Sequence, residues 1–574
     1  MDKAAIESIL AVDIGELTTR VILFELVDTQ FTAVARGEAP TTAAPQGDGI
    51  IAGVLDALRD VENAAGKKFL TPPTAGPAAV NPVDAVMVTL TAGPDIRTLC
   101  LSLTTELSLE SAVRLAGSTD TRVIAALSQA DGSIKSEQLD AILHAAAELV
   151  IISGGTETGR INQSGDQLSS LRAALALLPR DQRPTIFYAG SSALEEKTRH
   201  TIGPQAPLII SSNILPQVEQ EALDPARGEL MEAAARMRLK RVMGAAALVE
   251  QSGGKAALSS TGFGRMVRYL GSAYHPASGV LGIDLGISHL TLACAGGGQL
   301  WQGRYPYLPA EKAAAGDSLK HVLDWLAEPV DPEQAVEYWL RQDIAPGDKP
   351  GSLAEAVVDL ALARWRVQYA ARQFQVMYPQ LRLTGETGLL SGWEPIILSG
   401  EWAAGRLNPA QAALLLLDGL QPTGITNLVL DHRNWLSLLG ACGQAAPQLP
   451  VHLLEAGLLQ HLCTVITPIC QRADQADWLE LTLTPETGDE IQMTIRGGEL
   501  VRLALPEGQS ARLTLIPAPR VLLGRPLNQG RLTLKVTGSQ LGLVIDTRGR
   551  PISIPAAGPE RQQLISGWRN TLTL

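Results

Sequence analysis

A chain of 574 residues is too long to fold around one hydrophobic core, so we expect about three or four domains. Apolar residues make up 45% of the sequence and charged residues 18%, which indicates folded domains rather than disorder. The net charge is −12 and no dense run of Lys and Arg occurs, which argues against nucleic acid as a partner.

Targeting and metal-binding patterns are not apparent in the sequence. The opening residues MDKAAIESILAVDIG interrupt their apolar run with Asp and Glu, unlike a signal peptide. No window approaches the ~20 uninterrupted apolar residues of a membrane helix. The five cysteines lie far apart without a CxxC pair, and the eight histidines form no zinc motif. We therefore expect a cytoplasmic protein with no membrane span.

The most informative stretch near the N-terminus is AVDIGELTTRVILFE, residues 11–25. Two apolar runs around a short glycine-containing turn predict a β-hairpin. Asp13 ends the first run, and Gly15, Thr18 and Thr19 follow it. A carboxylate can hold Mg²⁺ through water while turn N–H groups and hydroxyls face phosphate, so the pattern suits a phosphate-and-metal site. An ordinary hairpin with a polar tip is the alternative.

Beyond the hairpin, the chain changes to alternating strands and helices. A strand at 32–37 and a helix at 49–65 are followed by a connector rich in Pro, Gly and Ala at 66–82. The strands then predicted are 85–90, 98–103, 121–127, 148–153, 185–189 and 208–211, and the helices are 108–116, 136–147 and 167–178. This alternation predicts βαβ units and a parallel sheet.

One loop of this region, SGGTETGR at residues 153–160, is rich in glycine and polar residues. It could hold an anion, or it could be a tight turn whose glycines need positive φ. It lacks both the Lys-Ser/Thr ending of a P-loop and the GxGxxG spacing.

A second hairpin pattern, GVLGIDLGISHLTLACAGGG, occupies residues 279–298. An apolar run leads to Asp284, Gly286 follows, and Ser288 and His289 form a short polar turn before the next strand. Two Asp-x-Gly hairpins about 270 residues apart predict an internally duplicated fold.

The second half also contains long helical stretches and a further turn of interest. Helices are predicted within 217–255, 351–377, 409–418 and 434–442, and a strand at 427–431. The apolar strand EPIILSG, at 394–400, ends at Ser399 and Gly400 before a helix. A strand that runs into a glycine turn and a helix can place the base and ribose of a nucleotide.

The last hundred residues have a different pattern. Short alternating segments at 479–484, 490–495, 511–516, 531–536 and 542–545 predict a separate antiparallel β-domain. Within it, LGLVIDTRGRPISIP predicts a strand, a turn and a strand, with Arg548 and Arg550 at the tip. A surface turn is expected there, and a docking site is the alternative.

These motifs together resemble those of the actin/Hsp70/sugar-kinase ATPase superfamily. AVDIGELTTR and GIDLGISHLT are similar to its two phosphate motifs, and EPIILSG is similar to its adenosine motif. Within the superfamily, the chain resembles the MutL (GlmL) family, encoded beside adenosylcobalamin-dependent glutamate mutase and unrelated to the mismatch-repair protein of the same name. This likeness rests on AELVIISGGTETGRINQ, TIFYAGSSAL, LIISSNILPQVEQEALDPAR and DGLQPTGITNLVLD…LGACG, and it covers about residues 8–470.

The resemblance implies an α/β, two-lobed actin/Hsp70-like fold with ATP and Mg²⁺ in the cleft between the lobes. The implied parts are a first lobe at 1–82, an inserted parallel α/β domain at 83–250, a second lobe at 251–472 and a C-terminal antiparallel β-domain at 473–574. Asp13 and Asp284 would face the metal and phosphates, since phosphoryl transfer depends on charge neutralisation and positioned donors. The implied nucleotide contacts are Gly15, Thr18, Thr19, Gly286, Ser288, Ser399 and Gly400.

Two departures from the family pattern weaken this site. His289 and Leu290 stand where the family carries threonines in the second motif, and Glu401 stands where a second glycine is usual. Lost hydroxyl donors and an added carboxylate both disfavour phosphate or ribose. We therefore predict weak or absent ATP hydrolysis, with nucleotide binding retained, and we expect His289 to be a polar turn residue rather than a compensating donor.

The sequence leaves three functions open. The first is an ATP-dependent accessory or reactivating chaperone for a partner enzyme, such as a cobalamin-dependent mutase, driven by lobe closure. The second is a non-hydrolysing scaffold on a degenerate ATPase fold. A small-molecule kinase comes third, because no motif identifies its catalytic base.

Overall fold

The computed structural model describes residues 6–573 apart from 43–48, 70–82, 103–105, 129–142, 145, 159–163, 219, 254–255, 274–278, 309–316, 382–391 and 471–475. The chain forms two compact units. The N-terminal unit contains residues 1–265, 302–304 and 437–452, and the C-terminal unit contains 266–301, 305–436 and 453–574. Each unit is described by itself.

The N-terminal unit contains a five-stranded sheet in the order β10-β4-β1-β2-β3. Its strands are β1 (Ser8–Ile14), β2 (Thr18–Val27), β3 (Gln30–Pro40), β4 (Ala85–Leu90) and β10 (Ala256–Leu258). β1 and β2 form the predicted hairpin, and β4 runs parallel to β1. The helix predicted at 49–65 is confirmed as α1 (Ile51–Ala65), which packs on β3 and β2.

A second sheet of this unit is entirely parallel, in the order β6-β5-β7-β8-β9. Its strands are β5 (Ile96–Ser102), β6 (Thr121–Ser128), β7 (Leu149–Ser153), β8 (Thr185–Tyr188) and β9 (Leu208–Ile210). The parallel βαβ prediction is confirmed for these strands. It is wrong for Ala85–Leu90, because that strand pairs with β1 of the first sheet through six consecutive residues.

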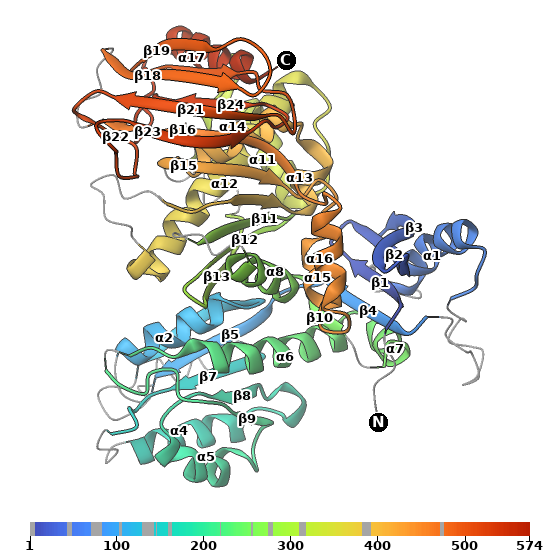
Figure 1. The fold of residues 1–574 in the computed structure, drawn as a ribbon. Coiled ribbons are helices and arrows are strands. Elements are labelled where there is room, and N and C mark those ends of the chain that lie inside the picture. The colour runs from blue at the N-terminus through green and yellow to red at the C-terminus, as the bar shows by residue number, and fades with distance from the viewer. Residues whose placement is uncertain are drawn as a thin grey trace. The chain divides into compact units, whose positions relative to one another are not determined.

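Helices cover both faces of the parallel sheet, as its two-sided burial requires. Figure 1 shows α2 (Glu106–Gly117) and α6 (Leu223–Arg241) along one face, and α4 (Ser164–Leu177) and α5 (Glu195–Ile202) along the other. A short helix, α7 (Ala245–Gln251), follows α6. The helix predicted at 136–147 lies largely outside the described residues.

The C-terminal unit contains an eight-stranded sheet in the order β13-β12-β11-β14-β15-β16-β24-β20. The strands, in chain order, are β11 (Val280–Leu285), β12 (His289–Gly296), β13 (Gln299–Pro306), β14 (Ile396–Ser399), β15 (Gly424–Leu430), β16 (Gln460–Thr467), β20 (Leu500–Leu503) and β24 (Leu543–Asp546). Its first five positions repeat the order of the N-terminal sheet, strand for strand, when that sheet is taken from its β3 edge. In both sheets a hairpin lies beside two parallel strands, so the predicted duplication is confirmed.

The strands of the last hundred residues pair antiparallel with one another, as predicted, but two of them join the large sheet. β18 (Asp477–Pro485), β19 (Ile491–Arg496), β21 (Ser510–Pro517) and β23 (Leu532–Thr537) form their own sheet. A two-stranded sheet joins β17 (Ile469–Cys470) and β22 (Val521–Leu522). β24 and β20, by contrast, extend the eight-stranded sheet, because their alternating apolar residues share a core with β16.

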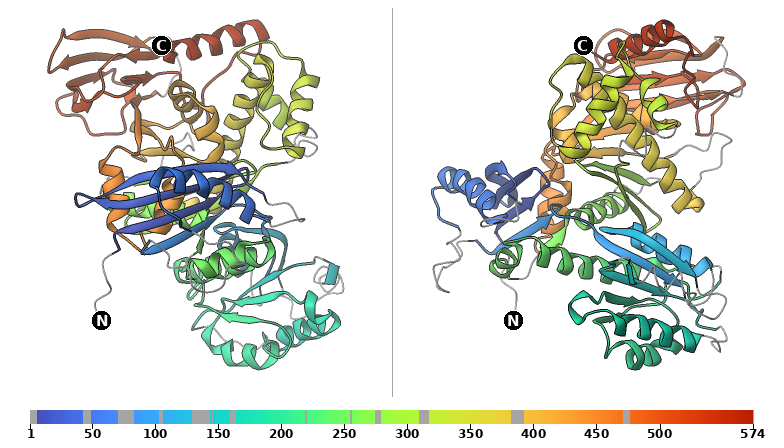
Figure 2. Two further views of the ribbon diagram at one scale, coloured as in Figure 1. Left: turned by 90° about the vertical axis from the view of Figure 1, so that its right-hand side faces the viewer. Right: turned by 180° about the vertical axis from the view of Figure 1, so that it is seen from behind.

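Helices pack against the C-terminal unit's large sheet. They are α12 (Leu353–Met377), α13 (Glu401–Arg406), α14 (Pro409–Gly419) and α17 (Gly558–Leu572). α10 (Ser318–Leu323) and α11 (Pro332–Ile344) pack on α12 instead. The chain also contains α8 (Ser259–Ala273), α15 (Leu436–Cys442) and α16 (Gln448–Glu455). The sequence pattern did not predict α17, which packs against α14 and is the red helix in both views of Figure 2. Among the described residues, no helix combines the length and apolar character needed to cross a bilayer.

Candidate functional site

Asp13 lies at the carboxyl-terminal end of β1, between residues of the two neighbouring strands. Arg20 of β2 and Thr89 of β4 are its register partners. The Thr89 hydroxyl donates to Asp13 Oδ1 at 2.6 Å, and Arg20 Nη1 lies 3.3 Å from Asp13 Oδ2. Burial raises the pKa of Asp13, while Arg20 and Thr89 oppose that rise. Arg20 therefore balances part of the negative charge of this carboxylate.

The turn after Asp13 is closed by its own backbone and by Thr41. The Gly15 N–H donates to the Thr18 carbonyl at 3.0 Å, and the Thr41 hydroxyl donates to the Gly15 carbonyl at 3.0 Å. The Thr41 N–H donates to the Leu17 carbonyl at 2.7 Å. Thr19 is fully buried, with its hydroxyl 2.9 Å from that of Thr41, whereas Thr18 is half-buried. Of the two predicted hydroxyl donors, Thr18 is therefore the more accessible.

The turn after Asp284 has the same backbone hydrogen bonds. The Gly286 N–H donates to the His289 carbonyl at 3.0 Å, and the Tyr307 N–H donates to the Ser288 carbonyl at 3.0 Å. The Tyr307 hydroxyl donates to the Gly286 carbonyl at 2.7 Å, as Thr41 does in the first turn. The two turns are thus equivalent in backbone as well as in sequence pattern.

This equivalence pairs the residues of one turn with those of the other. Thr18 corresponds to His289, Thr19 to Leu290 and Arg20 to Thr291, since the strand registers coincide. Asp13 faces Thr89 across parallel strands, and Asp284 faces Ser399 in the same way. His289, expected as a polar turn residue, instead begins β12 and is 4% exposed, because the antiparallel ladder continues to the glycine turn. The second turn therefore has no hydroxyl at the position of Thr18, and its exposed hydroxyl belongs to Ser288, which lies 3.3 Å from His289 Nδ1.

Tyr307 is a residue that the sequence motifs did not assign to the site. It follows Pro306, the last residue of its strand, as Thr41 follows Pro40, and this shared position was the available signal. Its ring also carries the Arg366 guanidinium, whose Cζ lies 3.9 Å from the ring centre. Tyr307 thus joins the second turn to α12.

Ser399 and Gly400 make contacts that differ from those expected of an adenosine turn. The Ser399 hydroxyl donates to Asp431 Oδ2 at 2.8 Å, and the Gly400 N–H donates to Asn434 Oδ1 at 3.2 Å. Gly400 has φ +112°, and an added Cβ would lie 2.2 Å from the Leu285 carbonyl oxygen. The glycine is therefore required by the approach of the backbone to β11, whatever ligand the turn meets. Glu401 is half-buried at the start of α13.

Asp431 organises the loop after β15. The carboxylate accepts from the Leu436 N–H at 2.9 Å as well as from Ser399. Burial raises its pKa, and these hydrogen bonds oppose the rise. The sequence pattern marked this residue only as a strand end.

The LGACG run that contributed to the family resemblance lies near Asp13 within the N-terminal unit. Burial raises the pKa of Cys442 to about 12, and the Asp13 charge adds to the rise, which places the thiol close to that carboxylate. Gly440 and Gly262 face each other where α15 crosses α8, and a Cβ on Gly440 would lie 1.9 Å from the Gly262 oxygen. These small residues allow the two helices to approach closely.

The SGGTETGR loop is a turn held by side chains of its own domain. Gly154 and Gly155 have φ of +132° and +81°, in agreement with the tight-turn alternative. Glu157 accepts from the Asn213 amide at 2.7 Å and also from the Ser192 hydroxyl. The Gly159 and Arg160 positions lie outside the described residues.

The donor groups of the two turns suit a magnesium nucleotide rather than a free metal ion. Asp13 and Asp284 each supply a carboxylate beside a glycine turn, which suits a hydrated Mg²⁺. Among the described residues, no three or more Asp, Glu, His or Cys side chains gather as a metal-binding group.

Two sheets of one strand order, each with an Asp-x-Gly turn at the same place, define the class: this is an α/β protein of the actin/Hsp70/sugar-kinase fold. The model of the MutL protein family matches residues 9–291, from the first strand through the second turn. This match confirms the resemblance inferred from the motifs.

Comparison with curated proteins finds no match. Among solved structures, the diol dehydratase-reactivating factor in its nucleotide-free form is 10% identical, with 78% of this chain and 100% of that chain covered and a TM-score of 0.31. Component A of the Acidaminococcus fermentans (R)-2-hydroxyglutaryl-CoA dehydratase is 8% identical (77% and 99% covered, TM-score 0.27). Xylulose kinase from Bifidobacterium adolescentis is 12% identical (79% and 94% covered, TM-score 0.27). With TM-scores this low, none of the three supports an argument about function.

Proposed function

We propose that this protein binds a magnesium nucleotide through Asp13 and Asp284 and acts as an accessory, chaperone-like protein on a partner enzyme. The observation that carries the proposal is the pair of equivalent Asp-x-Gly turns, both of which lie in the part of the chain that matches the MutL family. The partner class that the family resemblance implies is a cobalamin-dependent mutase.

Hydrolysis should be slow. Arg20 already pairs with the Asp13 carboxylate, and the hydroxyls of Thr19 and Ser399 form hydrogen bonds within the protein. In the second turn, His289 stands at the position equivalent to Thr18 and carries no hydroxyl. A phosphoryl-transfer site needs positioned donors at the phosphate, and this one retains few.

Calorimetry with Mg-ATP tests the binding step. We expect saturable heat for the wild type, at least tenfold weaker affinity for Asp13→Asn and for Asp284→Asn, and no change for Asp28→Asn. Asp28 is an exposed residue with φ +46° on the same hairpin region, a conformation that Asn also tolerates, so it is a matched control. Absence of heat in the wild type would exclude ATP binding.

Two further measurements separate the accessory ATPase from its alternative, a non-hydrolysing scaffold. Phosphate release by the wild type that is lost in Asp284→Asn supports turnover, whereas a flat signal despite binding supports the scaffold. Retention of a cobalamin-dependent mutase subunit by the full chain, with release changed by Mg-ATP, is the expected result for the partner. A mutase that is never retained would contradict that part of the proposal.

A further inference from the structure

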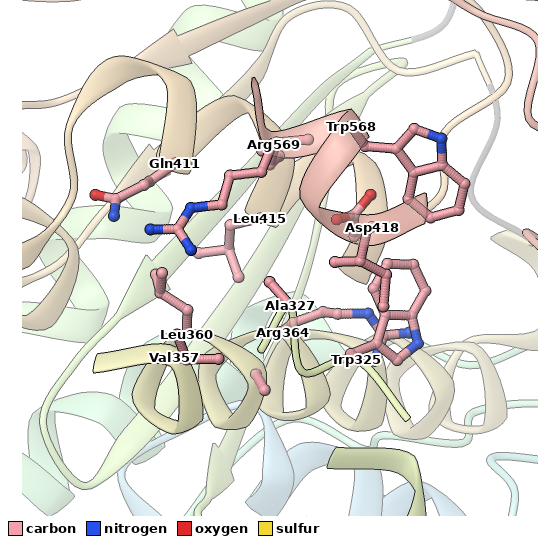
Figure 3. Close-up of a pocket in the computed structure, with 13 residues that line it drawn as sticks. Trp325, Ala327, Val357, Leu360, Arg364, Gln411, Leu415, Asp418, Trp568 and Arg569 are labelled. Atoms are coloured by element: carbon pink, nitrogen blue, oxygen red, sulfur yellow. The ribbon is translucent and has the colours of Figure 1, made fainter. Parts of the chain in front are cut away.

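A cavity of about 90 Å³ lies in the C-terminal unit, between helices that the nucleotide proposal does not use. Its walls come from α12, α14, α17 and the segment after α10. Most of the lining is apolar and includes Leu360, Ala361, Leu415 and the rings of Trp325 and Trp568. Figure 3 shows Arg364 and Asp418 beside the rings of Trp325 and Trp568, and Arg569 on the side of Gln411 and Leu415.

Arg364 is the unusual member of this lining. It is 5% exposed, and Trp325 covers one face of its guanidinium, with Cζ 3.5 Å from the ring centre. Nη2 makes one long contact, 3.5 Å to Gln368 Oε1. Among the residues that the structure describes, none accepts a hydrogen bond from Nε or Nη1. A guanidinium stacked on a ring keeps its N–H donors in its own plane, where a carboxylate can accept from them.

The carboxylate in the cavity wall does not satisfy Arg364. Asp418 pairs with Arg548 at 2.9 Å, and Arg548 in turn pairs with Asp546 at 2.8 Å. Arg550 also binds Asp546, at 2.9 Å. This buried cluster therefore holds three cations, Arg364 included, and two carboxylates, so one positive charge lacks a counter-ion. Burial lowers the pKa of Arg364 to about 9, so it is still charged at neutral pH.

The other arginine of the cavity is already partnered and more exposed. Arg569 lies 3.8 Å from Glu328, and its side chain is 36% exposed. Figure 3 shows it extending from α17 toward Gln411, away from Trp325. An anion that contacts both the apolar wall and an unpaired cation would therefore bind Arg364 rather than Arg569.

We propose that this cavity binds a short aliphatic monocarboxylate, with its carboxylate accepting from the unpartnered Nε–H of Arg364 and its chain against Leu360, Ala361 and Leu415. An apolar cavity of about 150 Å³ takes up benzene, so this smaller volume suits an apolar part of about four carbon atoms. Inorganic phosphate would leave the apolar wall bare and carries more charge than the single cation balances. Pentanoate has the matching shape and charge.

Pentanoate binding to the full chain, measured by calorimetry and by ligand-observed NMR, tests the site. We expect saturable binding to the wild type, with pentanamide and inorganic phosphate each at least tenfold weaker. Arg364→Gln should lose at least tenfold in pentanoate affinity, and Arg569→Gln should bind like the wild type. Equal affinity for pentanamide, or an unchanged Arg364→Gln variant, would overturn the proposal.

A second variant tests whether a loss of binding in Arg364→Gln reflects the site itself or misfolding. Ala361→Met keeps Arg364 and fills the cavity, so it should also abolish pentanoate binding. Arg364→Gln removes an unpaired buried charge and should therefore melt no lower than the wild type. Pentanoate should raise the melting temperature of the wild type alone among these three. These measurements need no nucleotide, so their failure would leave the proposed nucleotide function untouched.

Discussion

Residue by residue, the two Asp-x-Gly turns differ more than their shared backbone suggests. Asp13 lies opposite an arginine on the neighbouring antiparallel strand. At the same position, Asp284 lies opposite Thr291, which carries no charge. The sequence motif could predict both carboxylates, because Asp followed by glycine after a strand is a local pattern. It could not predict the Arg20 contact, because cross-strand neighbours depend on register.

The pair of Asp13 and Arg20 predicts unequal effects of its two substitutions. Arg20→Met leaves a buried carboxylate with Thr89 alone and should destabilise β1 and β2 by about 3 kcal/mol. Asp13→Asn keeps a polar partner for Thr89, and Arg20 retains Glu38 at 3.6 Å, so the cost should be about 1 kcal/mol. Hydrogen exchange of the β1 and β2 amides measures both. Equal costs would show that the ion pair contributes little.

At the level of helices and strands, close backbone contacts and buried ion pairs determine which of the predicted segments pack together. The RGRP turn was expected at the surface, and that expectation is wrong: the side chains of Arg548 and Arg550 are fully buried on Asp546. β24 extends the large sheet, and both arginines of the turn that follows it bond to Asp546 at the end of that strand. Charged residues in a turn indicate exposure only when no buried carboxylate pairs with them.

Gly400→Ala should destabilise the C-terminal unit by about 3 kcal/mol. The new Cβ would clash with the Leu285 carbonyl, and the positive φ adds strain. Gly405→Ala, in the same short helix, adds a Cβ that meets no atom within 4 Å and should instead stabilise by up to about 1 kcal/mol. Thermal unfolding of both variants checks the contrast. Similar melting temperatures would contradict the close approach.

Asp546 predicts a specific acid sensitivity. Burial alone would raise the pKa of Asp546, but Arg548 and Arg550 outweigh it and hold the pKa well below its usual value. As the pH falls, Asp546 is protonated in the unfolded chain before it is protonated in the folded protein. The stabilisation that Asp546 gains from Arg548 and Arg550 therefore decreases as the pH drops below about 4. Asp546→Asn should cost about 3–5 kcal/mol at pH 7, because two buried cations remain.

The deficit of the Asp546→Asn variant should shrink as the pH falls through that window. Melting temperatures of wild type and variant between neutral and acid pH measure the difference. Glu490→Gln, which removes a fully exposed carboxylate, serves as the control and should change little. A deficit that stays constant with pH would contradict the assigned pKa shift.

At the scale of the whole molecule, a buried arginine of the N-terminal unit connects the inserted parallel sheet to the sheet that contains β1 and β4. Arg238 of α6 donates to the carbonyls of Thr91 and Gly93, at 2.5 and 2.6 Å, in the segment that leaves β4. The Thr91 N–H donates in turn to the Ile14 carbonyl, next to the Asp13 turn, at 2.9 Å. Arg238 also pairs with Asp120 at 2.7 Å. One buried side chain thus links α6 to the strand ends beside the first turn.

Arg238→Met should destabilise this junction by about 3 kcal/mol or more, because several buried acceptors lose their donor together. Hydrogen exchange in β4 and β5 should rise accordingly. Arg236→Met, two residues away on an exposed part of the same helix and 3.8 Å from Glu232, should cost less than about 0.5 kcal/mol. Equal exchange in the two variants would show that Arg238 does not couple the sheets.

The amino-acid pattern was sufficient to predict the hairpins, the parallel inserted sheet, the duplication and the MutL family, because all of these depend on local periodicity and short motifs. It also located β18, β19, β21, β23 and β24 near the C-terminus. The folded chain was needed to show which sheets receive Ala85–Leu90 and Leu543–Asp546, that Thr41 and Tyr307 close the two turns, and that Arg364 faces a cavity. The physical reason is that pairing partners, burial and unpaired charges depend on residues brought together from distant parts of the chain, which no local pattern records.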